Sequence, residues 1–108
     1  MIARRFRGPL TSANGGYAAG LLAGHVAAPA VEVTLRLPPP LERPLDVRLD
    51  GRRAVLLDGD EIVAEAEPSS LDVDPPGVSL EEAEAAERRH VRMGNEVFWE
   101  CFSCGARR

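Results

Sequence analysis

Two cysteines three positions apart carry the most reactive side chains of this sequence. Cys101 and Cys104 form a Cys-x-x-Cys pair near the C-terminus. Such a pair can give zinc two of its four ligands, and only His25 and His90 could add imidazoles. The pair could also be a redox dithiol, although the βαβ pattern typical of redox Cys-x-x-Cys motifs is missing. Because no second close-spaced pair is present, we expect no metal and two reduced thiols, with zinc binding and redox chemistry as the alternatives.

A second candidate group lies near the N-terminus, where Asn14, Gly15 and Gly16 precede an apolar segment. Asparagine is a good helix N-cap and glycine lets other backbone approach closely, so the structural interpretation is a capped, tightly packed helix start. Within residues 17–28 only His25 carries a polar side chain. We expect His25 near the C-terminal end of the helix, where the dipole favours positive charge, and remote from Asn14.

The apolar segment predicts a helix over residues 13–27. A helix that is apolar on every side is typically buried on every side, so we expect the strands that follow to wrap around it. Each glycine inside the helix lowers helix stability by about 1 kcal/mol relative to alanine, so we expect close packing at these positions to offset the loss. The same glycines argue against a signal peptide. The segment is also shorter than the roughly 20 apolar residues that span a bilayer.

Alternation of apolar and polar residues predicts four strands, at about 31–37, 45–50, 53–57 and 60–67. Three consecutive prolines after the first strand end it, because proline cannot donate to a ladder. Asp50-Gly51 and Asp58-Gly59 are two-residue hairpin signals. The helix and this antiparallel meander together make an α+β core over residues 1–68.

The remaining chain predicts a linker and a C-terminal unit. Residues 69–78 are rich in proline, serine and aspartate and indicate the linker, and residues 79–108 form the unit. Ser79 and Glu82 have the spacing of a capping box at the start of a charged helix, which we expect on the surface. The tail gathers aromatic residues beside the two cysteines, so we expect it to dock on a partner or to lead into a larger protein.

The composition fits a single globular domain. The 108 residues include 13 basic and 17 acidic side chains, which gives a net charge of −4. This balance gives no general attraction to nucleic acids or anionic membranes, so we expect neither as a partner. Two cysteines are too few for the disulfide framework of a small secreted protein, and we expect a cytoplasmic location.

The order of these features resembles the hot-dog fold of acyl-CoA thioesterases and dehydratases. Residues 12–19 (SANGGYAA) are similar to the start of the family's helix, where His-Gly-Gly or Asn-Gly-Gly is common, and residues 31–67 resemble its strands. The chain is also similar to the N-terminal half of actinobacterial thioesterase-like proteins of about twice its length. Those proteins carry a Cys-Phe-x-Cys-Gly stretch, like residues 101–105, near the junction with a second half.

The resemblance implies a chemical role for the helix start. In the hot-dog family, backbone N–H groups there face the thioester carbonyl, where unpaired donors and the helix dipole favour developing negative charge. The implied substrate-binding residues are Gly15, Gly16 and Tyr17, and the implied catalytic residues are Asn14 and Gly16. The acid that many family members carry on the helix is replaced here by Ala23, so enzymatic activity stays an open question.

The resemblance therefore implies one of two functions, neither of which needs a cofactor. One is an acyl-CoA thioesterase-like domain that hydrolyses or binds an acyl thioester near the helix N-terminus, at a dimer interface. The alternative is a non-catalytic hot-dog module that binds an acyl ligand or supplies a dimer interface. In either case we expect a homodimer, because hot-dog units cover their exposed sheet edges by pairing.

Overall fold

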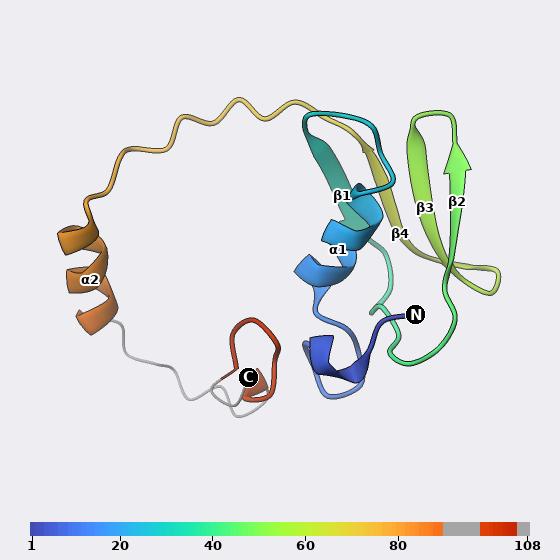
Figure 1. The fold of residues 1–108 in the computed structure, drawn as a ribbon, viewed down its shortest axis with the longest axis horizontal. Coiled ribbons are helices and arrows are strands. Elements are labelled where there is room, and N and C mark those ends of the chain that lie inside the picture. The colour runs from blue at the N-terminus through green and yellow to red at the C-terminus, as the bar shows by residue number, and fades with distance from the viewer. Residues whose placement is uncertain (90–97, 106–108) are drawn as a thin grey trace.

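The computed structural model describes residues 1–89 and 98–105, and it confirms the α+β class (Figure 1). The described chain forms two α-helices and a four-stranded antiparallel sheet. In chain order the elements are the short 3₁₀ helix η1 (Arg4–Phe6), α1 (Gly15–Ala23), β1 (Val31–Leu35), β2 (Asp46–Asp50), β3 (Arg53–Asp58), β4 (Glu61–Pro68) and α2 (Leu80–Arg89).

The sheet has the strand order β1-β4-β3-β2. Its last three strands form the expected meander of two hairpins. Gly51 and Gly59 hold φ values of 59° and 60° at the two turns, a conformation that glycine adopts without strain. β1, the first strand of the chain, pairs antiparallel with β4, the last strand, and places Val33 opposite Ala66. The strand bounds lie within two residues of those predicted, and the largest difference is the early end of β1 at Leu35.

Helix α1 lies on one face of the sheet, and its buried stripe is formed by Ala18 and Leu22, four residues apart (Figure 1). Leu22 is 1% exposed. It joins one apolar core with Val26 and with residues of β3 and β4, namely Ala54, Leu56, Val63, Ala64 and Ala66. The spacing of Ala18 and Leu22 turns one flank of the helix towards the strands.

The expectation of a helix buried on every side is wrong for α1. Gly16 and Gly20 are exposed, and Leu21 is 48% exposed. The helix also ends at Ala23 instead of residue 27. Because its other flank is exposed, α1 covers one face of the sheet, and the sheet does not wrap around it. A Cβ at Gly20 would meet no described atom within 4 Å, so close packing does not explain this glycine.

The edge strand β2 leaves part of the sheet open. Every residue of β2 is exposed, although Val47 and Leu49 are apolar; their exposed fractions are 37% and 62%. β2 lies at the edge of the sheet next to β3, and α1 packs towards β1, β4 and β3. The face of the sheet beside β2 is therefore only partly covered by the described chain.

The N-terminal segment holds the start of α1 in place. Asn14 N donates to Phe6 O over 2.8 Å, and Ala13 N donates to Pro39 O over 2.8 Å. Ile2 is buried in a second apolar cluster with Ala13 and Ala18. These contacts tie residues before the helix, and the proline-rich segment after β1, to the first turn of α1.

The C-terminal helix confirms the predicted capping box. Ser79 Oγ accepts from Glu82 N over 3.2 Å, and Glu82 Oε2 accepts from Ser79 N over 2.9 Å. No residue of α2 is buried, as expected for a surface helix. The core, linker and C-terminal division at residues 68 and 78 stays a prediction. None of the described helices has the length and apolar character needed to span a membrane.

Candidate functional site

The start of α1 is a capped helix end with two open backbone donors. Asn14 has extended backbone angles (φ −61°, ψ 126°), and its Oδ1 accepts from Tyr17 N over 2.9 Å. The predicted N-cap is therefore confirmed. This cap also takes up one of the three N–H groups that the resemblance assigned to substrate. Among the described residues, nothing accepts a hydrogen bond from the N–H groups of Gly15 and Gly16.

The two glycines of the helix start differ in their surroundings. A Cβ on Gly15 would lie 2.9 Å from Leu35 Cδ1, so this position is close to β1. A Cβ on Gly16 would lie 3.4 Å from Asn14 Oδ1, which is an ordinary contact, and Gly16 is exposed. The Gly16 N–H is therefore the more accessible of the two candidate donors.

Cys101 comes from the far end of the chain to the helix cap. Asn14 Nδ2 donates to Cys101 Sγ over 3.5 Å, so one amide side chain contacts both the helix and the thiol. Cys101 is 3% exposed, whereas Cys104 is exposed. Cys104 Sγ donates to Cys101 Sγ over 3.0 Å. The structure thus joins the two candidate groups of the sequence, which are separated by more than 80 residues, into one site.

The pKa of the Cys101 thiol reflects opposing influences. Burial alone raises this pKa, because a thiolate loses hydration inside the protein. Hydrogen bonds to the sulfur from the Cys104 side chain, from the backbone at Cys104 and Ser103, and from the Asn14 side chain favour the thiolate. Together they outweigh burial and lower the pKa of Cys101 from 9.0 to about 7. A substantial fraction of Cys101 is therefore thiolate at neutral pH.

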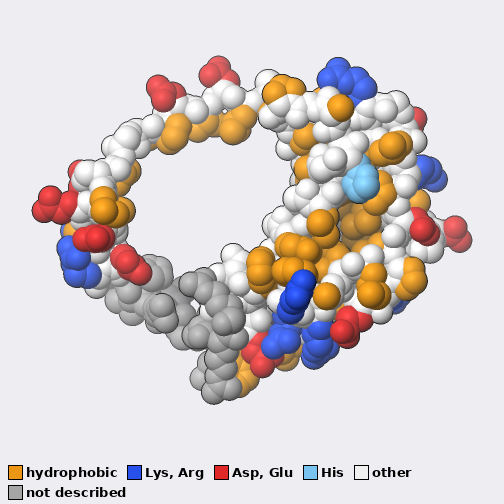
Figure 2. All heavy atoms as spheres, in the orientation of Figure 1, with side chains coloured by type: hydrophobic (Ala, Val, Ile, Leu, Met, Phe, Trp, Pro, Cys, Tyr) orange, Lys and Arg blue, Asp and Glu red, His pale blue; other side chains and the backbone are white. Residues whose placement is uncertain are grey.

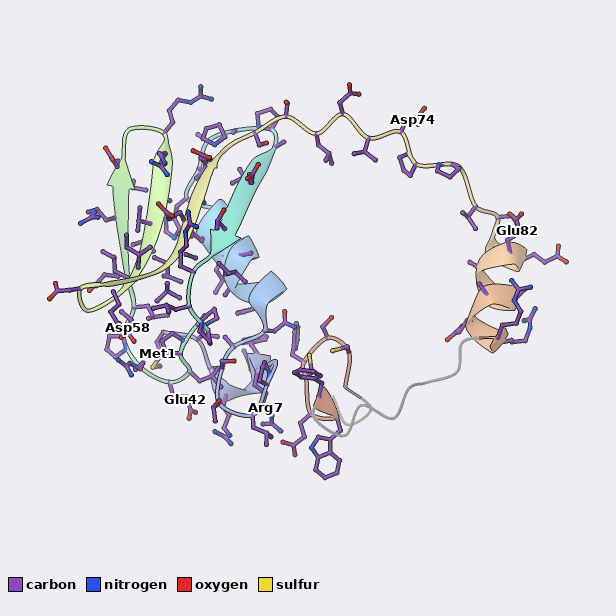
Figure 3. All side chains as sticks on the ribbon, turned by 180° about the vertical axis from the view of Figure 1, so that it is seen from behind. Met1, Arg7, Glu42, Asp58, Asp74 and Glu82 are labelled. Carbon is purple, nitrogen blue, oxygen red and sulfur yellow. The ribbon has the colours of Figure 1, made fainter. Side chains whose placement is uncertain are left out.

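The C-terminal loop (residues 98–105) docks on the N-terminal segment (Figure 3). Phe102 N donates to Arg7 O over 2.7 Å, and the Arg7 guanidinium pairs with Glu100 at 2.5 Å. The Phe102 ring meets the stacked rings of Phe6 and Tyr17 edge-on, with centroid distances of 5.1 and 5.7 Å. The described part of the predicted tail therefore packs on its own chain.

Gly105 closes this loop. Its N–H donates to Cys101 O over 2.9 Å. A Cβ at Gly105 would lie 2.6 Å from both Cys101 N and Cys101 O, and it would also collide with Trp99 O. These neighbours are backbone atoms that cannot rotate away, so the loop geometry around Cys101 requires glycine at this position.

A separate apolar hollow lies beside α1, on the open side of the sheet. Its volume is about 180 Å³. Hydrophobic side chains gather on this face of the molecule (Figure 2). Helix α1, the edge strand β2, its neighbour β3 and the N-terminus contribute to its lining, which consists of Met1, Ile2, Ala18, Leu21, Leu22, His25, Leu45, Val47 and Leu56. Among the described residues that line the hollow, His25 alone has an ionisable side chain, so the hollow suits an apolar ligand.

The remaining predicted site residues lie elsewhere. His25 follows the end of α1, where its N–H donates to Leu22 O over 3.0 Å, and it borders the hollow instead of the cap. Ala23, which the resemblance aligned with an acidic residue of the hot-dog thioesterases, is the last residue of α1. In the described part of the chain, no three side chains of His, Cys, Asp or Glu come together as metal ligands. His90, an alternative zinc ligand, lies outside the described residues.

Comparison of the chain with protein-family models, with curated proteins and with solved structures found no match. The assignment of the candidate site therefore depends on the geometry of its residues alone. Sequence reasoning found Asn14 and the two cysteines separately but missed their contact and the hollow. Neither the contact between Asn14 and Cys101 nor the hollow is marked by a pattern of neighbouring residues, because both are formed by segments that meet only after folding.

Proposed function

We propose that this chain is an acyl-ligand binding module, and that the hollow beside α1 receives the apolar end of an acyl group. The observation that carries the proposal is the hollow itself, an apolar recess bordered by the exposed Leu21 and Val47. Ligand sites are typically concave and mostly apolar, with few polar groups. Of the described side chains that line the hollow, only that of His25 is ionisable, which fits an acyl chain better than a polar substrate.

The size of the hollow favours an acyl group of medium length. A dry apolar cavity of about 150 Å³ holds one benzene molecule. The hollow, at about 180 Å³, therefore suits an apolar end of comparable size. We expect a medium-length acyl chain to bind more tightly than acetyl, because each buried CH₂ contributes about 0.8 kcal/mol.

Binding is tested by calorimetry of the full chain with acetyl-, butyryl-, hexanoyl- and dodecanoyl-CoA. Leu21→Glu places a charge at the hollow and should abolish binding of the hexanoyl compound. Leu10→Glu is the matched control, since Leu10 is 51% exposed, Leu21 is 48% exposed, and only Leu21 lines the hollow. Affinity that is independent of chain length, or equal in the two variants, would refute the assignment.

A second candidate is hydrolysis of the same thioester at the helix start. It is favoured by the open N–H groups of Gly15 and Gly16, which lie at the positive end of α1 and can receive an oxyanion. Gly16→Pro deletes one of these donors at a position where helices accept proline, and Gly16→Ala keeps it. Turnover lost in the proline variant and retained in the alanine variant supports hydrolysis. Turnover absent for every acyl-CoA, or equal in both variants, excludes this role.

The finer fold assignment is part of the same proposal. A helix followed by an antiparallel meander supports a hot-dog arrangement in which a second copy covers what one chain leaves open. The exposed flank of α1, with Leu21, and the exposed edge strand β2 would lie in this cytoplasmic homodimer. Light scattering after gel filtration tests it, and a monomer at high concentration would refute it.

A further inference from the structure

We propose that Cys101 and Cys104 form a redox-active dithiol, which thiol–disulfide exchange with an external disulfide converts into an intramolecular disulfide. The site is the C-terminal loop where it docks on the cap of α1. This activity is independent of acyl binding, because neither cysteine lines the hollow.

The two sulfur atoms are already close enough to react. Cys101 Sγ and Cys104 Sγ are 3.0 Å apart, and a disulfide bond is about 2.05 Å long, so oxidation requires a movement of about 1 Å. Gly105 N donates to Cys101 O and closes the loop that carries both residues. The loop therefore holds the two thiols close together in the reduced protein.

The different exposure of the two cysteines gives each a separate role. Cys104 is exposed and can meet an external disulfide, whereas Cys101 is 3% exposed and cannot. Cys104 Sγ–H also donates to Cys101 Sγ, so its proton already points at an acceptor. Cys104 is thus placed as the attacking thiol and Cys101 as the resolving thiol.

The exchange balances in two steps. Starting from the Cys101 thiolate, Cys104 Sγ passes its proton to Cys101 Sγ and attacks one sulfur of the external disulfide, which releases the first thiolate and leaves a mixed disulfide on Cys104. Cys101 Sγ then gives that proton to the released thiolate and attacks Cys104 Sγ, which releases the second thiolate. Two electrons pass from the protein to the external disulfide, which leaves as one thiol and one thiolate.

The surroundings of Cys101 support the second step. Its pKa is lowered to about 7 by hydrogen bonds that outweigh burial, so the resolving sulfur ionises readily near neutral pH. Asn14 contributes one of these bonds through Nδ2 and is a positioning residue for the thiolate. Zinc is the competing interpretation, but no third or fourth ligand joins the two sulfurs within the described residues.

The test uses the full chain, reduced and then equilibrated with mixtures of reduced and oxidised glutathione at neutral pH. Free thiols are trapped by alkylation and counted by mass spectrometry. The expected result is concerted loss of both thiols without a lasting glutathione adduct. A stable adduct on the unaltered protein, retention of both thiols in excess oxidised glutathione, or a bound zinc ion that blocks oxidation would overturn the proposal.

Two serine variants assign the roles. Cys101→Ser should accumulate glutathione on Cys104, because the resolving thiol is gone. Cys104→Ser should form little adduct in the folded state, because Cys101 is buried. Circular dichroism checks that both variants fold. Rapid adduct formation on a folded Cys104→Ser variant, or none on a folded Cys101→Ser variant, would contradict this division between the two thiols.

Discussion

Replacement of Asn14 by aspartate separates the two contacts of its side chain. Oδ1 of Asn14 caps α1 through Tyr17 N, and Nδ2 donates to Cys101 Sγ. Aspartate keeps a capping oxygen and adds a negative charge at the positive end of the helix dipole, so the helix should not lose stability. The same substitution deletes the donor to the sulfur and places a carboxylate beside the thiolate.

The distance sets the size of the expected effect. Two like charges about 4 Å apart repel by about 1 kcal/mol in water and about 4 kcal/mol at the effective dielectric constant near a protein surface. One pKa unit corresponds to about 1.4 kcal/mol. With Asn14 Nδ2 3.5 Å from Cys101 Sγ, Asn14→Asp should raise the pKa of Cys101 from about 7 by roughly one to three units.

The assay is the pH dependence of the ultraviolet absorbance of the Cys101 thiolate at about 240 nm, which needs no reagent to reach the buried sulfur. It is measured in a Cys104→Ser background so that only one thiol titrates. Serine at position 104 keeps a hydroxyl that can donate to Cys101 Sγ in place of the Cys104 thiol. Asn14→Ala is the matched control: it loses the donor without adding charge, so the pKa should rise less. It also loses the cap, which should lower the free energy of unfolding by about 1 kcal/mol. Superimposable pH profiles with and without the Asn14→Asp substitution would refute the contact between this side chain and the thiolate.

Three further outcomes follow from the same structure. Because folding lowers the pKa of Cys101 from 9.0 to about 7, its thiolate stabilises the reduced protein fully above the unfolded pKa and progressively less as the pH falls towards 7. The unfolding free energy of the unaltered protein relative to Cys101→Ser, from urea titrations, should therefore rise between these pH values, and a constant difference would contradict the shift. Gly105→Ala should open the loop and speed Cys101 alkylation, because its Cβ meets backbone at 2.6 Å; an unchanged rate would contradict that packing. Leu22→Ala should lower the unfolding free energy by about 2–5 kcal/mol, whereas Leu21→Ala, on the exposed flank, should change it by well under half as much; equal losses would place both in the core.

Local signals accounted for most of the secondary structure. Strand alternation and the Asp-Gly pairs at 50–51 and 58–59 act through neighbouring residues, and the hairpins formed where they predicted. The Ser79 capping box and the Asn14 cap are equally local, because each links residues three positions apart. Such features need no knowledge of the rest of the fold.

The burial of α1 could not be derived in the same way. Its residues are apolar on all sides, yet only Ala18 and Leu22 are fully buried. The apolar composition indicates that burial of the helix would be favourable. It does not indicate whether one face of the sheet or a second chain buries it. The short helix and the exposed edge strand β2 left Leu21 at the border of an open hollow.

The sequence by itself determined the strands, the turns and the caps, because the interactions that decide them lie within a few residues. Only the tertiary structure decided that Cys101 reaches Asn14 and that the C-terminal loop rests on Arg7 and on the aromatic neighbours of Phe102. Those contacts join the two ends of the chain, and their formation depends on the combined shape and polarity of surfaces that exist only once each segment has folded.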